Sequence, residues 1–244
     1  MTTIYLIRHG QASANAPVYD QLSRTGYEQT RELGRYWAAR QLPIDLIACG
    51  TLQRQKQSMQ SFQEGLHSTG GRQDETSLTG KTACFPALDE IPESTWRALG
   101  SELRSSDPRL ERHFQSWLQL RSSGSRRAGL FFSKITAAVL LYWLEGKHQP
   151  HIPSFADFHH KVLQILTEIR QFQEQQHIVL FSSGTPIALL CGQALGLKAA
   201  QSLALVRTIR NSSISILEMH RRQLQLVSLN CTPHLQQPAG ITLV

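Results

Sequence analysis

An arginine and a histidine stand side by side at Arg8 and His9, directly after an apolar run rich in β-branched residues. Such a run predicts a strand buried in a sheet. Ligands of open α/β sheets bind just beyond the carboxyl ends of the strands, where these two residues would stand. An imidazole beside a permanently charged guanidinium suits attack on an anionic phosphoryl group. A lone Arg-His-Gly triplet more often only closes a strand in a polar loop, so the rest of the chain has to decide.

Polar residues also follow three other predicted strands. Arg54 comes after the second strand, Asp89 and Glu90 after the third, and residues 182–185 after the fourth. In a parallel sheet these strand ends share one edge. Arg8 and Arg54 could then clamp the oxygens of one phosphoryl group by forked, charge-assisted hydrogen bonds.

Together these residue types could transfer a phosphoryl group. His9 would attack through a ring nitrogen and form phosphohistidine. Glu90 would protonate the leaving alcohol and later activate water, although Asp89 and Glu93 are rival acids nearby. The helix that follows Gly184 would add free N–H groups and the positive end of its dipole.

Strands and helices alternate along most of the chain, which is typical of a parallel sheet with crossover helices. We expect an α/β fold with three layers, α/β/α, and a mainly parallel sheet. A tight turn joins the last two strands into a C-terminal hairpin. The predicted strands are residues 3–7, 44–49, 83–88, 177–181, 213–219 and 223–229.

Residues 94–153 interrupt this alternation with several arginines and two predicted helices. We expect a helical insertion over one edge of the sheet, within a single domain that covers residues 1–244. The apolar stretch 130–144 contains Lys134 and is too short to span a bilayer. It predicts a helix buried against the domain, so no membrane partner is expected.

The composition of the chain limits the classes of molecule that it is expected to bind. The net charge of +7 and the pI near 9.5 favour anionic partners, both small phosphorylated molecules and nucleic acids. The aromatic residues of the insertion have the spacing of a core, so no nucleic-acid partner is expected. Four scattered cysteines without a Cys-x-x-Cys pair favour a reduced, cytoplasmic compartment. The histidines between residues 148 and 160 lack the companions of a metal site, so neither a metal nor another cofactor is expected.

Five motifs follow one another along nearly the whole chain: Arg8-His9-Gly10, Leu22-Ser23-x-x-Gly26-x-x-Gln29, Leu52-x-Arg54, Leu88-x-Glu90 and Asn211-Ser212-Ser213. Their order resembles the histidine phosphatase (phosphoglycerate mutase-like) superfamily. The resemblance implies that His9 is the phosphorylated histidine, that Arg8 and Arg54 bind the phosphate, and that Glu90 is the proton donor. It also implies a mainly parallel sheet flanked by helices.

One position departs from this family, which normally places a second histidine after the fourth strand. Ser183 stands there, followed by Gly184. A hydroxyl can donate a hydrogen bond to the phosphoryl group but brings no positive charge, and hydrogen bonds to charged groups contribute about 1.5–3 kcal/mol, neutral ones less. We expect Ser183 and Gly184 to contact the phosphate with reduced turnover, and Ser183→His to raise it.

The resemblance implies hydrolysis of a phosphomonoester, on a small phosphorylated metabolite, through phosphohistidine. Phosphoglycerate mutase-type transfer is an alternative, although the segments that mutases carry after Arg-His-Gly and after the acid are missing. A phosphate-binding protein with weakened catalysis is a second alternative, because of Ser183. The sequence identifies neither the substrate nor an oligomeric state.

Overall fold

The computed structural model describes residues 1–13, 20–68, 81–125, 127–172, 176–221, 223–237 and 240–243. Within these residues six strands form one sheet, in the order β3-β2-β4-β1-β5-β6. The pairs β3-β2, β2-β4 and β4-β1 are parallel, whereas β1-β5 and β5-β6 are antiparallel. The strands are β1 (Thr2–Arg8), β2 (Leu46–Cys49), β3 (Lys81–Cys84), β4 (His177–Ser182), β5 (Ile214–His220) and β6 (Gln223–Cys231).

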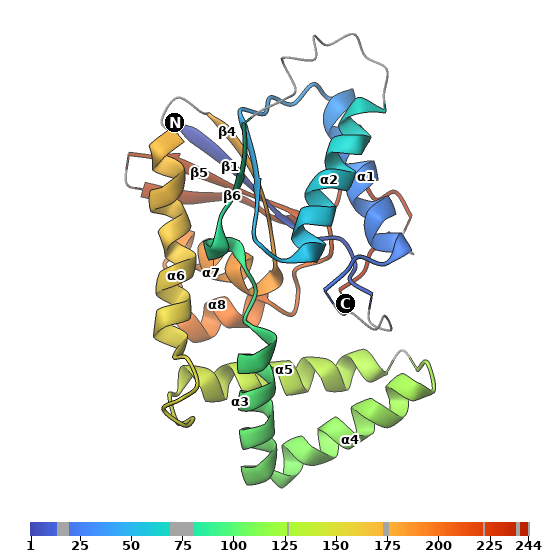
Figure 1. The fold of residues 1–244 in the computed structure, drawn as a ribbon, viewed down its shortest axis with the longest axis vertical. Helices are drawn as coiled ribbons and strands as arrows, with labels where there is room; N and C mark the ends of the chain where they lie inside the picture. The colour runs from blue at the N-terminus through green and yellow to red at the C-terminus, as the bar shows by residue number, and fades with distance from the viewer. Residues whose placement is uncertain are drawn as a thin grey trace.

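Helices cover both faces of the sheet (Figure 1). On one face α1 and α2 pack against each other and against the strands, and Phe62 of α2 meets both Trp37 and Phe181 edge to face. On the other face lie α6, α7 and α8. This arrangement confirms the predicted three-layer α/β fold. The helices are α1 (Arg24–Ala39), α2 (Gln53–His67), α6 (Phe155–Glu168), α7 (Gly184–Ala194) and α8 (Ala199–Leu205).

β1 lies in the middle of the sheet, between β4 and β5. Ile4, Leu6 and Ile7 are all buried, since both faces of the strand are covered. A strand in this position has no solvent side, which is why its sequence is a continuous apolar run rather than an alternating one.

The third predicted strand is shorter than expected. β3 ends at Cys84, and Pro86–Leu88 forms a short 3-10 helix, η1, instead of continuing the strand. Proline fixes its own backbone and has no N–H to give to a neighbouring strand, so the ladder stops there. The η1 turn then carries Asp89 and Glu90 toward the ends of β2 and β4.

The arginine-rich region contains three helices rather than the predicted two. They are α3 (Glu93–Ser106), α4 (Pro108–Ser122) and α5 (Ala128–Leu144). Asp107 separates α3 from α4 and caps α4 by accepting a hydrogen bond from Arg109 N at 2.8 Å. Outside their own group the three helices contact mainly α8 and α6 through α5, not an edge strand as expected. Figure 1 shows them as a separate group beside the sheet layers. That they are an insertion into a single domain stays a prediction.

α5 is only partly buried. Val139, Leu140 and Trp143 lie in the core, but Leu130 is 65% and Leu141 is 47% exposed. The prediction of a helix at residues 130–144 is confirmed, whereas its complete burial is not. No helix in the described part of the chain is both long and apolar enough to cross a membrane.

Candidate active site

The carboxyl ends of β1 and β4 bring His9 and Ser183 to the same edge of the sheet. The parallel register pairs Arg8 with Ser182, and the N–H of His9 donates to the carbonyl oxygen of Ser182 at 2.9 Å. Ser183, the next residue on β4, therefore leaves the sheet beside His9.

The two ring nitrogens of the buried His9 have different roles. Nδ1 lies 2.7 Å from the carbonyl oxygen of Gly10. Because a carbonyl oxygen can only accept, Nδ1 carries the hydrogen and Nε2 keeps its lone pair. Arg54 Nε donates to this Nε2 at 3.3 Å. Burial, and then the charges of Arg54 and Arg8, hold the pKa of His9 well below its ordinary value of 6.5. His9 is therefore a neutral base at the edge of the sheet.

Arg54 is held in place by an acid that the sequence motifs did not indicate. Its Nη1 donates to Asp20 Oδ1 at 2.8 Å, and the guanidinium side chain is 9% exposed. The Asp20 carboxylate also accepts the N–H groups of Gln53, at 2.8 Å, and of Arg54, at 3.3 Å. A carboxylate at the N-terminus of a helix is stabilised by the free N–H groups and the dipole. Asp20 precedes these partners by more than thirty residues, so no local pattern connects them.

Arg8 approaches the same edge from β1. Its Nη1 donates to the carbonyl oxygen of Ile209, and its Nε lies 3.8 Å from the place of a Cβ added to Gly184. Its charge contributes to the lowered pKa of His9, as does that of Arg54. Both predicted phosphate ligands thus lie near the predicted nucleophile, and their binding of phosphate stays a prediction.

The two neighbouring acids, Asp89 and Glu90, face different parts of the edge. Glu90 Oε2 accepts the N–H of Thr185 in the first turn of α7 at 3.1 Å, and its Oε1 accepts the N–H of Ile91 at 2.9 Å. Both oxygens of Asp89 are taken by Thr51, one by its N–H and one by its hydroxyl, each at 2.6 Å. Glu90 therefore lies at the first turn of α7, close along the chain to Ser183, whereas Asp89 lies at the end of β2.

Ser183 is fully buried at the start of α7, and its hydroxyl oxygen accepts a hydrogen bond from Gln55 Nε2 at 2.9 Å. Gln55 follows Arg54 in α2, is also fully buried, and was not predicted as a site residue. A Cβ added to Gly184 would meet nothing nearer than 3.7 Å, so packing does not require a glycine there.

The C-terminal part of the chain holds the backbone at His9. The side-chain amide of Asn211 and the N–H of Ser212 both donate to the carbonyl oxygen of His9, each at 3.3 Å. Ser212 Oγ lies 2.8 Å from Nε2 of the buried His234, whose pKa is lowered to about 4 by burial. On the other side of His9, a Cβ added to Gly10 would lie 2.3 Å from a backbone oxygen of α1, so only glycine fits.

The sequence model of the histidine phosphatase superfamily (branch 1) matches residues 4–128 and 111–232. The chain belongs to the histidine phosphatase superfamily. The matched stretches contain His9, Arg54, Glu90 and Ser183. No curated protein matches the chain by sequence.

Several solved structures share the fold of this histidine phosphatase superfamily member. YhfR of Bacillus stearothermophilus has a TM-score of 0.63 at 17% identity, covering 96% of this chain and 99% of that one. A phosphoserine phosphatase from Entamoeba histolytica, in complex with 3-phosphoglyceric acid, has a TM-score of 0.60 at 19% identity, covering 96% and 100%. An alpha-ribazole phosphatase from Shigella flexneri has a TM-score of 0.59 at 18% identity, covering 95% and 97%. At these identities the likeness shows the fold.

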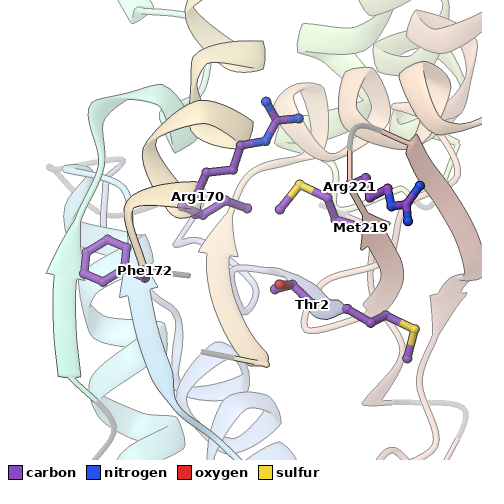
Figure 2. Close-up of a pocket in the computed structure, with 7 residues that line it drawn as sticks. Thr2, Arg170, Phe172, Met219 and Arg221 are labelled. Carbon is purple, nitrogen blue, oxygen red and sulfur yellow. The ribbon is translucent and has the colours of Figure 1, made fainter. Parts of the chain in front are cut away.

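A cavity of about 230 Å³ lies at the opposite end of β1, where the strand begins (Figure 2). It contains two arginines, but its lining includes neither an imidazole nor a carboxylate. None of the predicted site residues lies in it. The lining residues are Met1, Thr2, Ile169, Arg170, Phe172, Met219 and Arg221.

Proposed function

We propose that this histidine phosphatase superfamily member hydrolyses phosphomonoesters through a phosphohistidine intermediate at His9. The observation that carries the proposal is a buried, neutral imidazole whose Nε2 lies 3.3 Å from Arg54 Nε. Once a bound phosphoryl oxygen takes over the N–H that Arg54 donates to His9 Nε2, the lone pair of this nitrogen can attack phosphorus, and the guanidinium beside it can balance the charge of the phosphoryl oxygens. Family membership and the phosphatases among the structural neighbours support the same class of reaction.

The proposed reaction has two steps at one phosphorus atom. In the first step, His9 Nε2 forms a bond to phosphorus while the bond to the alcohol oxygen breaks, and Glu90 gives that oxygen a proton. In the second step, water attacks phosphorus, Glu90 takes a proton from the water, and the P–N bond breaks to restore His9. Arg8 and Arg54 hold the phosphoryl oxygens throughout, so that attacking and leaving atoms stay in line.

The substrate proposed is a small phosphorylated metabolite. The Entamoeba histolytica neighbour is a phosphoserine phosphatase solved with 3-phosphoglyceric acid. Phosphoserine and 3-phosphoglycerate are therefore the first compounds to test, beside a nitrophenyl phosphate as a general phosphomonoester.

Labelling of the enzyme tests the proposal. The protein is mixed with a phosphomonoester that carries ³²P and is quenched in alkali, because phosphohistidine hydrolyses in acid. We expect label on the wild-type protein that chases into inorganic phosphate, and none on His9→Gln. His220→Gln is the matched control, since His220 is exposed at the end of β5. Turnover without label on His9, or label that survives His9→Gln, would contradict the mechanism.

Phosphate binding without turnover is the second candidate function. It is favoured by Ser183, whose neutral hydroxyl stands where the sequence resemblance to the family implies an imidazole. The same experiment separates the two functions: a protein that binds inorganic phosphate tightly but never becomes labelled is a binding protein.

A further inference from the structure

Gln55 links three elements at the edge of the sheet. It is the third residue of α2 and is fully buried, although it is polar. Its Nε2 donates to the hydroxyl oxygen of Ser183 and to the carbonyl oxygen of Leu88 in η1, at 2.9 Å in both cases. The amide thus ties α2 to η1 and to the junction of β4 and α7.

The bond to Leu88 determines which way the Gln55 amide points. A carbonyl oxygen can only accept, so the amide nitrogen and not the amide oxygen must face Leu88. Leu88 O also accepts from the hydroxyl of Ser182 at 2.7 Å, and no third donor is needed there. The amide oxygen Oε1 lies on the side of Gly50, where an added Cβ would come within 2.1 Å of it.

Because the amide nitrogen faces Ser183, the serine hydroxyl must act as an acceptor in that bond. Its own hydrogen is then left for another acceptor. Within the described residues the side chain of Ser183 makes no hydrogen bond to the N–H groups of α7, although Ser183 is the residue that precedes the helix. The hydroxyl of Ser183 can therefore donate its hydrogen at the edge of the sheet where His9 also lies.

We propose that Gln55 is a positioning residue, which fixes the Ser183 hydroxyl so that its hydrogen points to a phosphoryl oxygen during transfer at His9. This inference rests on the proposed function. Ser183 donates a hydrogen bond and gives up no proton, so the proton balance of the two steps is unchanged. Gln55 acts only through Ser183 and does not touch the reacting atoms.

A double-mutant cycle tests this role, with binding of vanadate as a readout that needs no turnover. The variants are Gln55→Met, which keeps the volume and removes the amide, Ser183→Ala, and the two combined. Each single change should weaken vanadate binding about tenfold, the effect of one hydrogen bond to a charged group. The combined change should weaken binding no more than Ser183→Ala alone, since Gln55 has no effect without the hydroxyl.

Gln60→Met is the matched control, because Gln60 lies on the exposed side of α2; it should leave vanadate binding unchanged. If the two single effects multiply in the combined variant, or if Gln55→Met binds vanadate as the wild type does, the proposal is wrong. Thermal unfolding of each variant shows whether a loss of binding is a loss of fold.

Gln55→Glu gives a second test that a merely structural role would not pass. Above its pKa the introduced carboxyl group can only accept, so it takes the hydrogen of Ser183 away from the ligand. Binding relative to the parent with glutamine should therefore fall as pH rises through that pKa, and it should fall less when Ser183→Ala is also present, because repulsion between the carboxylate and vanadate acts in both backgrounds. An equal fall in the two backgrounds, or a constant ratio, would overturn the proposal. A wild-type protein that binds vanadate but never forms phosphohistidine would contradict the proposed function and leave this cycle interpretable. A wild-type protein that does not bind vanadate would overturn both.

Discussion

The two ends of β1 both carry pairs of arginines, yet they differ in chemistry. At the carboxyl end, Arg8 and Arg54 lie close enough to the buried His9 for their charges to lower its pKa. At the amino end, Arg170 and Arg221 line a cavity of about 230 Å³ together with apolar side chains (Figure 2). That cavity lacks an imidazole among its lining residues. The two ends therefore differ less in their cations than in the buried, neutral imidazole that stands beside the cations at the carboxyl end.

The difference follows from the topology of the sheet. Three parallel strands, β1, β2 and β4, end at the same edge as η1, so backbone N–H groups, helix N-termini and loops gather there. The amino end of β1 meets instead the end of an antiparallel strand, β5, through the pairing of Thr2 with Met219. Exchanging single residues at each end tests this comparison.

The largest difference is expected from the same substitution made at both ends. Arg54→Lys should lower kcat/KM for a phosphomonoester by about 100-fold, since lysine lacks the fork that donates to both His9 and Asp20. Arg221→Lys at the cavity end should leave kcat/KM unchanged. Steady-state kinetics measure both. Equal losses would show that the cavity end takes part in the reaction.

Acid should destabilise the protein through His234, which lies near the carboxyl end of β1. The pKa of His234 is about 4 in the folded protein and near 6.5 when unfolded, so between these values the unfolded state binds more protons. Stability should therefore fall as pH drops from 6.5 toward 4, by at most about 1.4 kcal/mol per pH unit from this histidine.

Urea unfolding at several pH values measures this slope. His234→Gln should make it shallower, whereas His220→Gln, at the exposed end of β5, should leave it unchanged. If the dependence of stability on pH is unchanged in His234→Gln, His234 is not a source of the loss of stability in acid.

A histidine introduced at Ser183 should increase the difference in activity between the two ends of β1, but only if Gln55 is replaced as well. The sequence led us to expect that Ser183→His alone raises turnover; with Gln55 Nε2 2.9 Å from Ser183 Oγ, we now expect the gain only if Gln55 is also replaced, since a ring would compete with this amide. Combining Ser183→His with Gln55→Ala should raise kcat about tenfold over wild type, the effect of one charged hydrogen bond. Ser183→His alone should lower it. If Ser183→His alone has a higher kcat than the double variant, this account of the packing around Ser183 is wrong.

The smallest effect is expected from Asp20, the acid that accepts a hydrogen bond from Arg54 near the carboxyl end of β1. Asp20→Asn keeps an acceptor for Arg54 but removes a negative charge near the proposed phosphate site. Vanadate should bind about threefold more tightly, since repulsion between exposed charges is weak in water. Calorimetric titration measures this change, and weaker binding would mean that the charge of Asp20, and not only an acceptor at this position, is needed to hold Arg54 in place.

Local patterns in the sequence were sufficient for the sheet and for the position of several candidate residues at one of its edges. The β1 run, the strand ends and the hairpin are each coded within a few residues, so the three-layer fold was predicted correctly. Glu90, which a short Leu-x-Glu motif indicates, accepts the N–H of Thr185 in α7, and its role as proton donor stays a prediction. The roles of Arg8, His9 and Arg54 remain predictions.

What could not be predicted depends on contacts between distant residues. Asp20 reaches α2 across 33 residues, and Gln55 reaches Ser183 across 128, so no periodicity reveals either. Apolar content alone did not show that α5 would leave Leu130 and Leu141 in solvent. The strand expected at 83–88 ended early because Pro86 interrupts it, a signal that was present in the sequence and was not used.

The central position of β1 has a consequence for how the protein is made. This strand precedes its neighbours β4 and β5 by more than 160 residues in the chain, and the amide of Asn211 reaches His9 across 202 residues. Until those segments leave the ribosome, the strand that carries the histidine has no pairing partner on either side and exposes an apolar surface. Nascent chains should therefore depend on chaperones, and acquire the ability to hold an oxyanion only after the segment that contains Asn211 has been synthesised.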